Sequence, residues 1–485
     1  MIYPFTIASL EKLYNLEYVS STLDPQEKKK LRLEICASLP KTMLPLHACL
    51  LENNGVGIVL SGPGGCGKST LASALEPLGY RQAAKDFIVV WEEKGKLWGG
   101  DLNFQSVNSG KKAVSIEKMV FLNKTDPRDL YRFDIHNAAK FYAESLYPQP
   151  EATSAKHSSG KIFRQLLANH FVLGNRISPE KWVKTFTHAM HSQSISRIGI
   201  IGLGTVGQDT ASLIAGENWV TQLNLFTTNS AKLKAVALDL QSADPTMSIK
   251  TFYDYDSILK QSDLVCLTFR SADGDMDPNV EERMRRLSAH CSVIRNFAQS
   301  IKISCYSGII LMVTNPVDLL SYALYRASKD AFLSSQIYGV GLGLDYNRLQ
   351  VVKPDKNLDV IGPHGDGLML VKRKSDTLYP YADKETEKKV KQYSNAVRAG
   401  TDRTRFGPAH EVLNVVRHFH DQTGTIRAST LTEDGVFLGR LLDINGNIPA
   451  SAVVISPDLK NSMQNIICKQ LRLQNNLINN VTSKE

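Results

Sequence analysis

The chain has 485 residues, about three times the length of a typical domain, which predicts two or three domains. Apolar residues make up 42% of the sequence and charged residues 22%, and these fractions exclude a mainly disordered or fibrous protein. The net charge of +9 arises from 57 basic against 48 acidic residues without a long basic run. We therefore expect nucleotide phosphates as anionic partners and no nucleic acid.

The sequence also limits where the protein works. No apolar run approaches the roughly 20 residues needed to span a bilayer, so we expect no membrane association. The first ten residues lack the basic and apolar regions of a secretory signal. The seven cysteines are scattered without CxxC spacing, which is typical of free thiols in a reducing compartment. We therefore predict a cytoplasmic protein.

The first motif is a glycine-rich phosphate loop. After a predicted N-terminal helical segment (1–45), an apolar strand is predicted over 56–60 and a helix over 70–75, and GxxxxGK[ST] is complete between them. Glycines let backbone N–H groups point at a phosphate, Lys68 would neutralise it, and the Ser69 hydroxyl would hold Mg²⁺. The motif thus predicts ATP and Mg²⁺ as ligands. The residues predicted to bind them are Gly62, Gly65, Gly67, Lys68, Ser69 and Thr70.

The sequence around this loop, from Leu46 to Ala72, resembles the HPr kinase-like P-loop domains. Those domains resemble phosphoenolpyruvate carboxykinase in fold and transfer phosphate to a hydroxyl group. The resemblance implies an ATP-binding domain over 46–150. In that family a pair of aspartates opens the next strand, whereas this chain has Ala84-Lys85-Asp86-Phe87 and keeps only the second one. By resemblance, Asp86 contacts Mg²⁺ as a metal ligand or accepts the substrate's proton as a catalytic base.

The next segment predicts a change of domain. Residues 147–161 are rich in Pro, Ser, Gln and His, and a helix is predicted over 178–190, so we assign 151–193 to a linker and a connecting helix. Short apolar runs then alternate with amphipathic segments, which predicts an α/β fold with a mostly parallel, doubly wound sheet. The predicted strands are 197–201, 223–226, 264–269 and 309–313.

A second phosphate loop follows the first of these strands, with GxGxxG at Gly202, Gly204 and Gly207. A strand before it and a helix after it favour a dinucleotide site. No carboxylate lies between Thr221 and Leu238, where a ribose-binding acid is expected. Small hydroxyl residues such as Thr227 would tolerate a 2′-phosphate, so NAD and NADP both stay open, as does a site that has lost most of its cofactor binding.

Three later motifs occur in order: Asn315-Pro-Val-Asp318, Leu344-Asp-Tyr-Asn-Arg348 and Gly362-Pro-His-Gly-Asp366. Together they resemble the lactate/malate dehydrogenases over about 190–440. The resemblance implies a Rossmann domain over 194–336 and an α+β substrate and catalytic domain over 337–485. It also implies a homo-oligomer, either a dimer or a tetramer.

The resemblance assigns roles to individual residues. His364 would exchange a proton with the substrate's hydroxyl oxygen, Asp345 would pair with the imidazole, and Arg348 would bind the substrate carboxylate. The DxxR spacing predicts Asp345 and Arg348 on adjacent faces of one helical turn. The family also implies Asn315 at the carbonyl and nicotinamide, Arg283 as the catalytic arginine of a lid that also binds substrate, and Thr404 in the substrate pocket.

The predicted lid disfavours malate as a substrate. It carries Asp273, Asp275 and Asp277 and no arginine between Ser271 and Glu282. At a surface-like dielectric, two like charges about 4 Å apart repel by roughly 4 kcal/mol, so this lid would oppose a second carboxylate. A neutral or cationic side group fits better, as does a substrate that reaches Arg403 or Arg405.

Three hypotheses follow for the whole chain. In the first, the protein is a bifunctional enzyme, an ATP-dependent small-molecule kinase fused to an NAD(P)-dependent 2-hydroxy acid dehydrogenase. In the second, the dehydrogenase-like half is a non-catalytic cofactor or metabolite sensor that regulates the kinase. In the third, an active dehydrogenase is joined to an inactive kinase-like scaffold, since Lys85 replaces an aspartate.

Overall fold

The chain forms two compact units, seen here in a computed structural model. Unit 1 comprises Met1–Asp126 and Tyr131–Thr187, and unit 2 comprises Pro127–Leu130 and His188–Glu485. Within the described residues, no helix is both long and apolar enough to cross a membrane. The described residues are 26, 39, 43–101, 113–132, 162, 165–166, 170–174, 179–190, 194–271, 286–328, 331–365, 367–401, 403–445 and 450–482.

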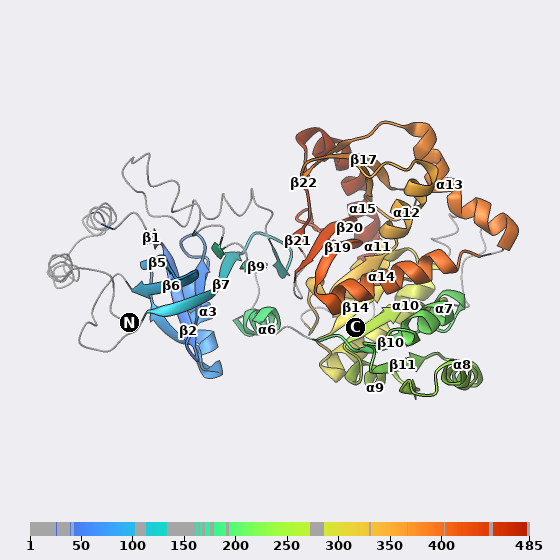
Figure 1. Cartoon of the computed structure of the whole chain (residues 1–485), viewed down its shortest axis with the longest axis horizontal. Coiled ribbons are helices and arrows are strands. Elements are labelled where there is room, and N and C mark those ends of the chain that lie inside the picture. The colour runs from blue at the N-terminus through green and yellow to red at the C-terminus, as the bar shows by residue number, and fades with distance from the viewer. Residues whose placement is uncertain are drawn as a thin grey trace. The chain divides into compact units, whose positions relative to one another are not determined.

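Unit 1 is built on a mixed sheet with the strand order β1-β5-β6-β7-β3-β2-β4, and β9 joins it by pairing with β7 and β8 (Figure 1). β3 runs parallel to β7 and antiparallel to β2, and the first phosphate loop connects β3 to α3. The strands are β1 (Met43–Leu46), β2 (Ala48–Asn53), β3 (Val56–Ser61), β4 (Arg81–Ala84), β5 (Ile88–Glu93), β6 (Lys96–Asp101), β7 (Val114–Asn123), β8 (Leu130–Tyr131) and β9 (His170–Gly174). The helices are α3 (Lys68–Leu75), the short 3-10 helix η1 (Glu76–Leu78) and α6 (Pro179–Met190).

The predicted strand–loop–helix unit is confirmed by β3 and α3, and the predicted connecting helix by α6. The predicted linker differs from the structure, because its residues 170–174 form β9, which pairs in parallel with β7. The sheet of unit 1 therefore extends beyond residue 150, where we expected the domain to end. The strand is short and fully buried, so no alternation of polar and apolar residues marks it in the sequence.

Unit 2 has a large sheet with the strand order β12-β11-β10-β13-β14-β15-β19-β20-β21. Its first six strands are parallel, and β19 joins β15 in the antiparallel direction. The sheet continues past residue 336, so it draws strands from both of the domains predicted there. Its strands are β10 (Arg197–Ile201), β11 (Gln222–Phe226), β12 (Ile249–Phe252), β13 (Leu264–Leu267), β14 (Ile309–Met312), β15 (Ile337–Val340), β19 (Thr423–Leu431), β20 (Phe437–Asn445) and β21 (Ala450–Ser451).

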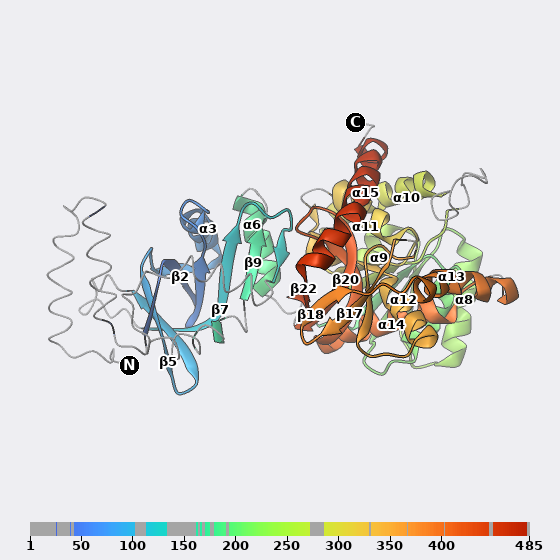
Figure 2. The same ribbon diagram turned by 90° about the horizontal axis from the view of Figure 1, so that it is seen from above.

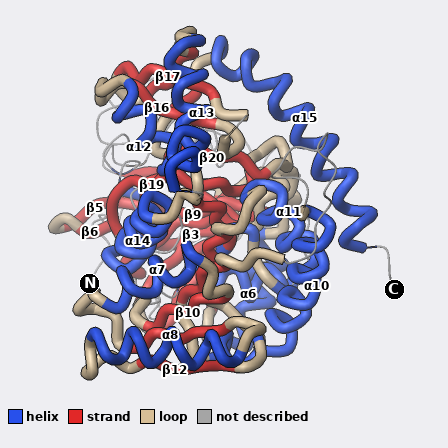
Figure 3. Tube along the Cα trace, turned by 90° about the vertical axis from the view of Figure 1, so that its right-hand side faces the viewer, coloured by secondary structure: helices blue, strands red, loops and turns tan. Residues whose placement is uncertain are grey.

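Helices cover both faces of this sheet, as the doubly wound prediction requires. Ile200 packs in a core with residues of α7, α8 and α14, whereas Val265 packs in a second core with residues of α9, α10 and α11. Figure 2 shows α10, α11 and α15 gathered together, and Figure 3 shows α7 beside α14. The helices are α7 (Thr205–Ala215), α8 (Ser230–Ala243), α9 (Tyr255–Lys260), α10 (Leu287–Ser304), α11 (Val317–Ser328), the short 3-10 helix η3 (Ser334–Gln336), α12 (Leu342–Val352), α13 (Lys384–Thr401), α14 (Phe406–Asp421) and α15 (Pro457–Thr482).

A second, four-stranded sheet in unit 2 supports α12. It consists of β16 (Leu358–Ile361), β17 (Met369–Lys374), β18 (Thr377–Pro380) and β22 (Val454–Ile455). Leu342 and Leu349 of α12 share a core with residues of β16, β17 and α13. The carboxyl ends of β14 and β15 lead directly into the Asn315 segment and α12, and the loop after β16 carries His364. These connections bring Asn315, Asp345 and His364 to one edge of the large sheet.

The separate cores predict separate responses to mutation. Leu50 lies in the core of unit 1 and Leu311 in that of unit 2, and both side chains are fully buried. Replacing either with alanine should cost about 2–5 kcal/mol of unfolding free energy, because the cavity is only partly refilled. In scanning calorimetry, Leu50→Ala should lower only the transition of unit 1 and Leu311→Ala only that of unit 2. Equal shifts of one shared transition in both variants would contradict this division.

Candidate active site

The centre of the candidate site is the carboxylate of Asp345, in the first turn of α12. Its Oδ2 lies 2.7 Å from His364 Nδ1 and accepts a hydrogen bond from the Gly365 N–H at 3.0 Å, and its Oδ1 accepts one from Arg348 Nη1 at 3.0 Å. Burial opposes ionisation, but the His364 imidazole, the Arg348 guanidinium and the Gly365 N–H together hold the pKa of Asp345 below its usual value. The geometry therefore fits an ionised Asp345 that orients the His364 ring through Nδ1.

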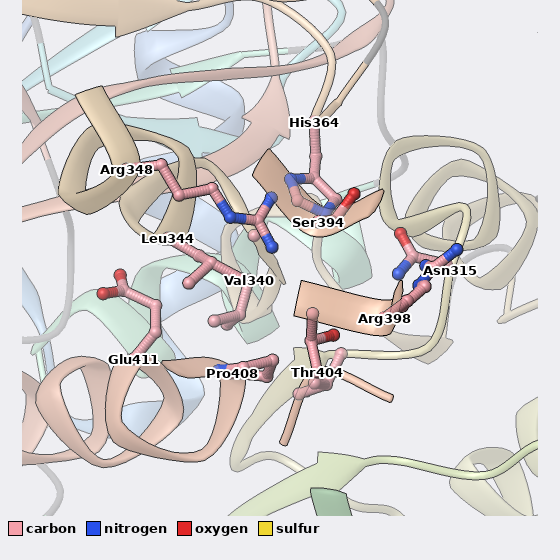
Figure 4. A pocket seen from close by; sticks show the side chains of 12 residues that line it. Asn315, Val340, Leu344, Arg348, His364, Ser394, Arg398, Thr404, Pro408 and Glu411 are labelled. Atoms are coloured by element: carbon pink, nitrogen blue, oxygen red, sulfur yellow. The ribbon is translucent and has the colours of Figure 1, made fainter. Parts of the chain in front are cut away.

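Arg348 lies closer to Asp345 than the sequence predicted. We expected the two side chains on adjacent faces of the helix, and instead they share one face and form a buried ion pair. Residues three apart are near neighbours on a helix, and the low exposure of both side chains favours direct pairing. Arg348 can still contact a ligand, because it lines the same pocket as His364 (Figure 4).

That pocket brings together most of the residues that the sequence predicted. Asn315, which follows β14 and forms a cis peptide bond with Pro316, lines it, and so does Thr404. Arg283 and the lid aspartates lie outside the described residues. The pocket is lined by Val313, Asn315, Val340, Gly341, Leu344, Arg348, His364, Ser394, Arg398, Thr404, Pro408 and Glu411.

Two predicted cations do not belong to this lining. Arg405 donates from Nε and Nη2 to both carboxylate oxygens of Asp209, at 2.8 and 2.6 Å, and this pair is largely exposed on the guanidinium side. The pocket lining does not include Arg403 either. The guanidinium of Arg405 is engaged by Asp209, and the expectation that a substrate reaches Arg403 or Arg405 stays a prediction.

Sequence reasoning missed four residues of the site. Asp318 is the last residue of the Asn-Pro-Val-Asp motif, and its buried Oδ2 accepts a hydrogen bond from the His364 backbone N–H at 3.1 Å. Ser394 and Arg398 come from α13, whose many charged residues made it resemble a solvent-exposed helix, although their spacing of four places them on one face. Glu411 comes from α14. Its buried carboxyl group gave no signal in the sequence.

Two glycines make room for these side chains. A Cβ atom at Gly341 would lie 2.6 Å from Cγ of His364, and one at Gly343 would lie 1.7 Å from Oε1 of Glu411. Burial raises the pKa of Glu411 to about 7, and the nearby Asp345 charge adds to this rise, while Arg427 opposes it. The pocket wall thus contains an acid that titrates near neutral pH.

The glycine-rich loop after β10 has the shape that a dinucleotide needs. Gly202 has φ +102°, and a Cβ atom there would lie 2.5 Å from the Phe269 backbone. A Cβ atom at Gly207 would lie 2.0 Å from the Gly202 carbonyl oxygen, so both positions exclude side chains. Gly204 precedes α7 and has no atom within 4 Å of a Cβ position, which leaves space for a pyrophosphate at the helix N-terminus.

The ribose end of this site contains hydroxyl and amide groups in place of a carboxylate. Thr227 follows β11 directly and is partly exposed. Asn229 caps α8 by accepting a hydrogen bond from the Lys232 backbone N–H at 2.9 Å. The residues present therefore fit a dinucleotide, and they do not discriminate against a 2′-phosphate by charge.

The phosphate loop of unit 1 has the backbone shape of an anion cradle. Gly62, Gly65 and Gly67 all have positive φ, and Gly67 precedes α3. Lys68 is buried, and its Nζ donates to the Gly62 carbonyl oxygen at 2.8 Å. Ser69 and Thr70 are exposed at the helix N-terminus. An anion bound there, or a cation bound to that anion, could contact both side chains.

Asp86 lies near this loop, in a turn after β4 where its φ is +64°. Burial raises the pKa of the Cys49 thiol to about 12, and the charge of Asp86 contributes, whereas those of Lys68 and Lys85 oppose the rise. All three charges are therefore close enough to act on this one thiol, which belongs to β2. Within the described residues, no group of three or more metal-ligating side chains is present.

Comparisons with known proteins show what unit 2 is similar to. The lactate/malate dehydrogenase NAD-binding domain family matches residues 196–335. The chain is 30% identical to an L-lactate dehydrogenase of Limosilactobacillus fermentum, over 36% of this chain and 56% of that enzyme. It is 27% identical to L-lactate dehydrogenase A of Hordeum vulgare, over 47% of this chain and 65% of that enzyme. The alignments thus span less than two thirds of these relatives' lengths.

Solved structures of dehydrogenases have a similar fold to part of this chain. A lactate dehydrogenase from a deep-sea metagenome library superposes with a TM-score of 0.50 at 20% identity, covering 60% of this chain and all of that one. The malate dehydrogenase of Archaeoglobus fulgidus, solved in complex with NADH, superposes with a TM-score of 0.51 at 22% identity, covering 58% of this chain and 99% of that one. Unit 2 therefore shares the fold of lactate and malate dehydrogenases, and its residues 196–335 match the NAD-binding domain of that family.

Proposed function

We propose that this protein is an NAD-dependent dehydrogenase that interconverts a 2-hydroxy acid and the corresponding 2-oxo acid. The observation that carries this proposal is that His364 and Arg348 line one pocket and that the buried Asp345 contacts both of them. The pocket lies at the sheet edge where the glycine-rich loop also lies. A base held by a buried carboxylate and a guanidinium beside it are the groups that a hydroxy acid requires.

Each residue of the cluster has a separate task. NAD would supply hydride transfer at its nicotinamide ring. The His364 imidazole would hold the proton that moves to or from the 2-oxygen, and the Asp345 carboxylate would stabilise the protonated ring. Arg348 would bind the substrate carboxylate by a forked pair of hydrogen bonds. Asn315 and Thr404, which line the pocket, would surround the 2-carbon.

The cofactor that we propose is NAD, which the matched domain binds by description. NADP stays an alternative, because Thr227 stands where no acid repels a 2′-phosphate. Four expectations stay predictions: the homo-oligomer, the cytoplasmic location, the role of Arg283, and a lid that disfavours malate.

Arg348→Ala should lower kcat/KM for 2-oxo acid reduction on the order of 100-fold, about 3 kcal/mol, because the substrate carboxylate loses its partner in a desolvated site. Arg348→Lys keeps the charge but loses the paired hydrogen bonds of the guanidinium, so its kcat/KM should lie between those of the alanine variant and the wild type. Steady-state NADH absorbance measures both. A wild-type kcat/KM in the alanine variant, with the protein folded, would remove Arg348 from substrate binding.

The raised pKa of Glu411 predicts that the unfolding free energy of unit 2 depends on pH. This pKa rises from 4.5 to about 7 on folding, so the native state binds the extra proton, and the unfolding free energy falls as pH rises through this range. The loss amounts to about 3 kcal/mol above pH 7. Glu411→Gln should lack it, so its stability relative to the wild type should increase by this amount between pH 4.5 and about pH 8.

Urea unfolding of unit 2 at several pH values measures this difference. Asp239→Asn, which alters an exposed carboxylate of α8, serves as the control and should show no such trend. A pH-independent difference between Glu411→Gln and the wild type would show that Glu411 titrates normally.

We further propose that unit 1 binds ATP with Mg²⁺. The buried Lys68, in a loop with three glycines of positive φ, supports phosphate binding. The exposed Ser69 hydroxyl and Asp86 are the candidate Mg²⁺ ligands. Phosphoryl transfer to a small-molecule hydroxyl, as in the HPr kinase-like resemblance, would need Asp86 as its base. Because Lys85 replaces the first aspartate, we favour a unit 1 that binds nucleotide without catalysing phosphoryl transfer. This is the third hypothesis, in which unit 1 is an inactive kinase-like scaffold.

Lys68→Ala should weaken ATP binding on the order of 100-fold, because the phosphates lose a buried charged donor. Titration calorimetry with Mg-ATP measures this, and Lys96→Ala, which removes an exposed charge from the same unit, is the control. Equal affinity of all three proteins for ATP would exclude the loop as the site. ADP release with hydroxylated acceptors then tests phosphoryl transfer.

A further inference from the structure

The phosphate loop of unit 1 lies beside the end of a second strand. β3 and β7 are parallel neighbours, with Ser61 paired to Phe121, so their carboxyl ends meet at one edge of the sheet. The loop leaves β3 at this edge, and Lys124 is the first residue after β7. Open α/β sheets bind their ligands at the carboxyl ends of parallel strands. Lys124 therefore stands next to any ligand that the loop holds.

The side chain of Lys124 contacts the loop directly. Its Nζ donates a hydrogen bond to the Gly65 carbonyl oxygen at 3.2 Å and lies over the ring of Trp182, 5.6 Å from the centroid. Trp182 belongs to α6 and is buried, and a Cβ atom at Gly67 would lie 2.6 Å from its Cζ3 atom. α3 and α6 accordingly lie close together in Figures 1 and 2. The Trp182 ring thus supports both the loop and the side chain of Lys124.

Two cations therefore act on this loop. Lys68 donates to the carbonyl oxygen of Gly62, and Lys124 donates to that of Gly65. Burial raises the pKa of the Cys66 thiol, which belongs to the same loop, and the charges of both lysines oppose this rise. The carbonyl oxygens that the two amines contact are neutral acceptors. A phosphate oxygen accepts a stronger, charge-assisted hydrogen bond, so a bound phosphate would draw the amines away from these carbonyl oxygens.

We propose that Lys124 is a second phosphate-binding residue of unit 1, and that it selects a nucleotide with a third phosphate. This inference rests on the proposed ATP binding by unit 1. The N-terminus of α3, Lys68 and Ser69 serve the phosphate that lies in the loop. Lys124 reaches the loop at Gly65 from the neighbouring strand, where a further phosphate would extend. A terminal phosphate has three acceptor oxygens and a charge of about −1.5 to −2 at pH 7, so it gains most from a second cation.

Titration calorimetry of the full-length protein with Mg-ATP and with Mg-ADP tests the proposal. Lys124→Met keeps an apolar side chain against Trp182 and removes the charge. This variant should bind ATP on the order of 30-fold more weakly and ADP less than about threefold more weakly. Lys124→Arg keeps the charge, so it should lose less ATP affinity. Lys96→Met, which removes an exposed charge from the same unit, is the control and should change neither affinity.

Tryptophan fluorescence gives a second readout. When the amine of Lys124 leaves the Trp182 ring for a phosphate, the surroundings of that ring change, so Mg-ATP should change the emission of the wild type. Trp182→Phe keeps an aromatic ring against Gly67 and should lose most of this change. An emission that saturating Mg-ATP leaves unaltered would show that Lys124 stays on the ring, and this would contradict the proposal.

Three outcomes of the calorimetry would overturn the proposal. An equal loss of ATP and ADP affinity in Lys124→Met would assign Lys124 a purely structural role at the loop. Unchanged affinity for both nucleotides would exclude Lys124 as a phosphate-binding residue and leave the proposed ATP binding by the loop intact. Binding of neither nucleotide by the wild type would overturn this inference together with the proposed ATP binding.

Discussion

The site depends on a single buried carboxylate that binds three partners at once. Asp345 is almost fully buried, and it accepts hydrogen bonds from the imidazole of His364, the guanidinium of Arg348 and the backbone N–H of Gly365. A buried charge is tolerated only when it is paired and hydrogen-bonded, so these partners must keep their places for the fold to hold the charge. The imidazole of His364 and the guanidinium of Arg348 are thereby fixed relative to each other.

The surrounding fold supplies the space and the orientation for this cluster. The His364 ring approaches Gly341 so closely that no side chain could stand there, and Asp318 holds the backbone of the same histidine from α11. Both α11 and α12 start directly after parallel strands of the large sheet. The carboxyl ends of such strands meet at one edge, where α/β proteins bind their ligands, and the loop at Gly204 lies at the same edge.

Much of this could be predicted from the sequence, because it depends on local signals. Gly202, Gly204 and Gly207 occur between an apolar strand and a helix, so the parallel sheet could be predicted. Asp345 and His364 lie in motifs whose order is informative, and the structure places these two side chains side by side. Arg398 and Glu411 could not be found in this way. They reach the pocket from α13 and α14 by tertiary packing, and no sequence motif distinguishes them from the other charged residues of these helices. β9 was missed because its five residues are all buried and carry no alternation.

The central claim is that the His364–Asp345–Arg348 cluster performs hydride chemistry on a 2-oxo acid. The most direct measurement incubates the full-length protein with NADH deuterated at nicotinamide C4 on either face and a panel of 2-oxo acids, and follows the label by mass spectrometry. Deuterium should appear at C2 of a hydroxy acid product from one labelled face only, and His364→Gln should abolish the transfer. Binding of NADH without transfer of label to any acid of the panel would contradict the claim.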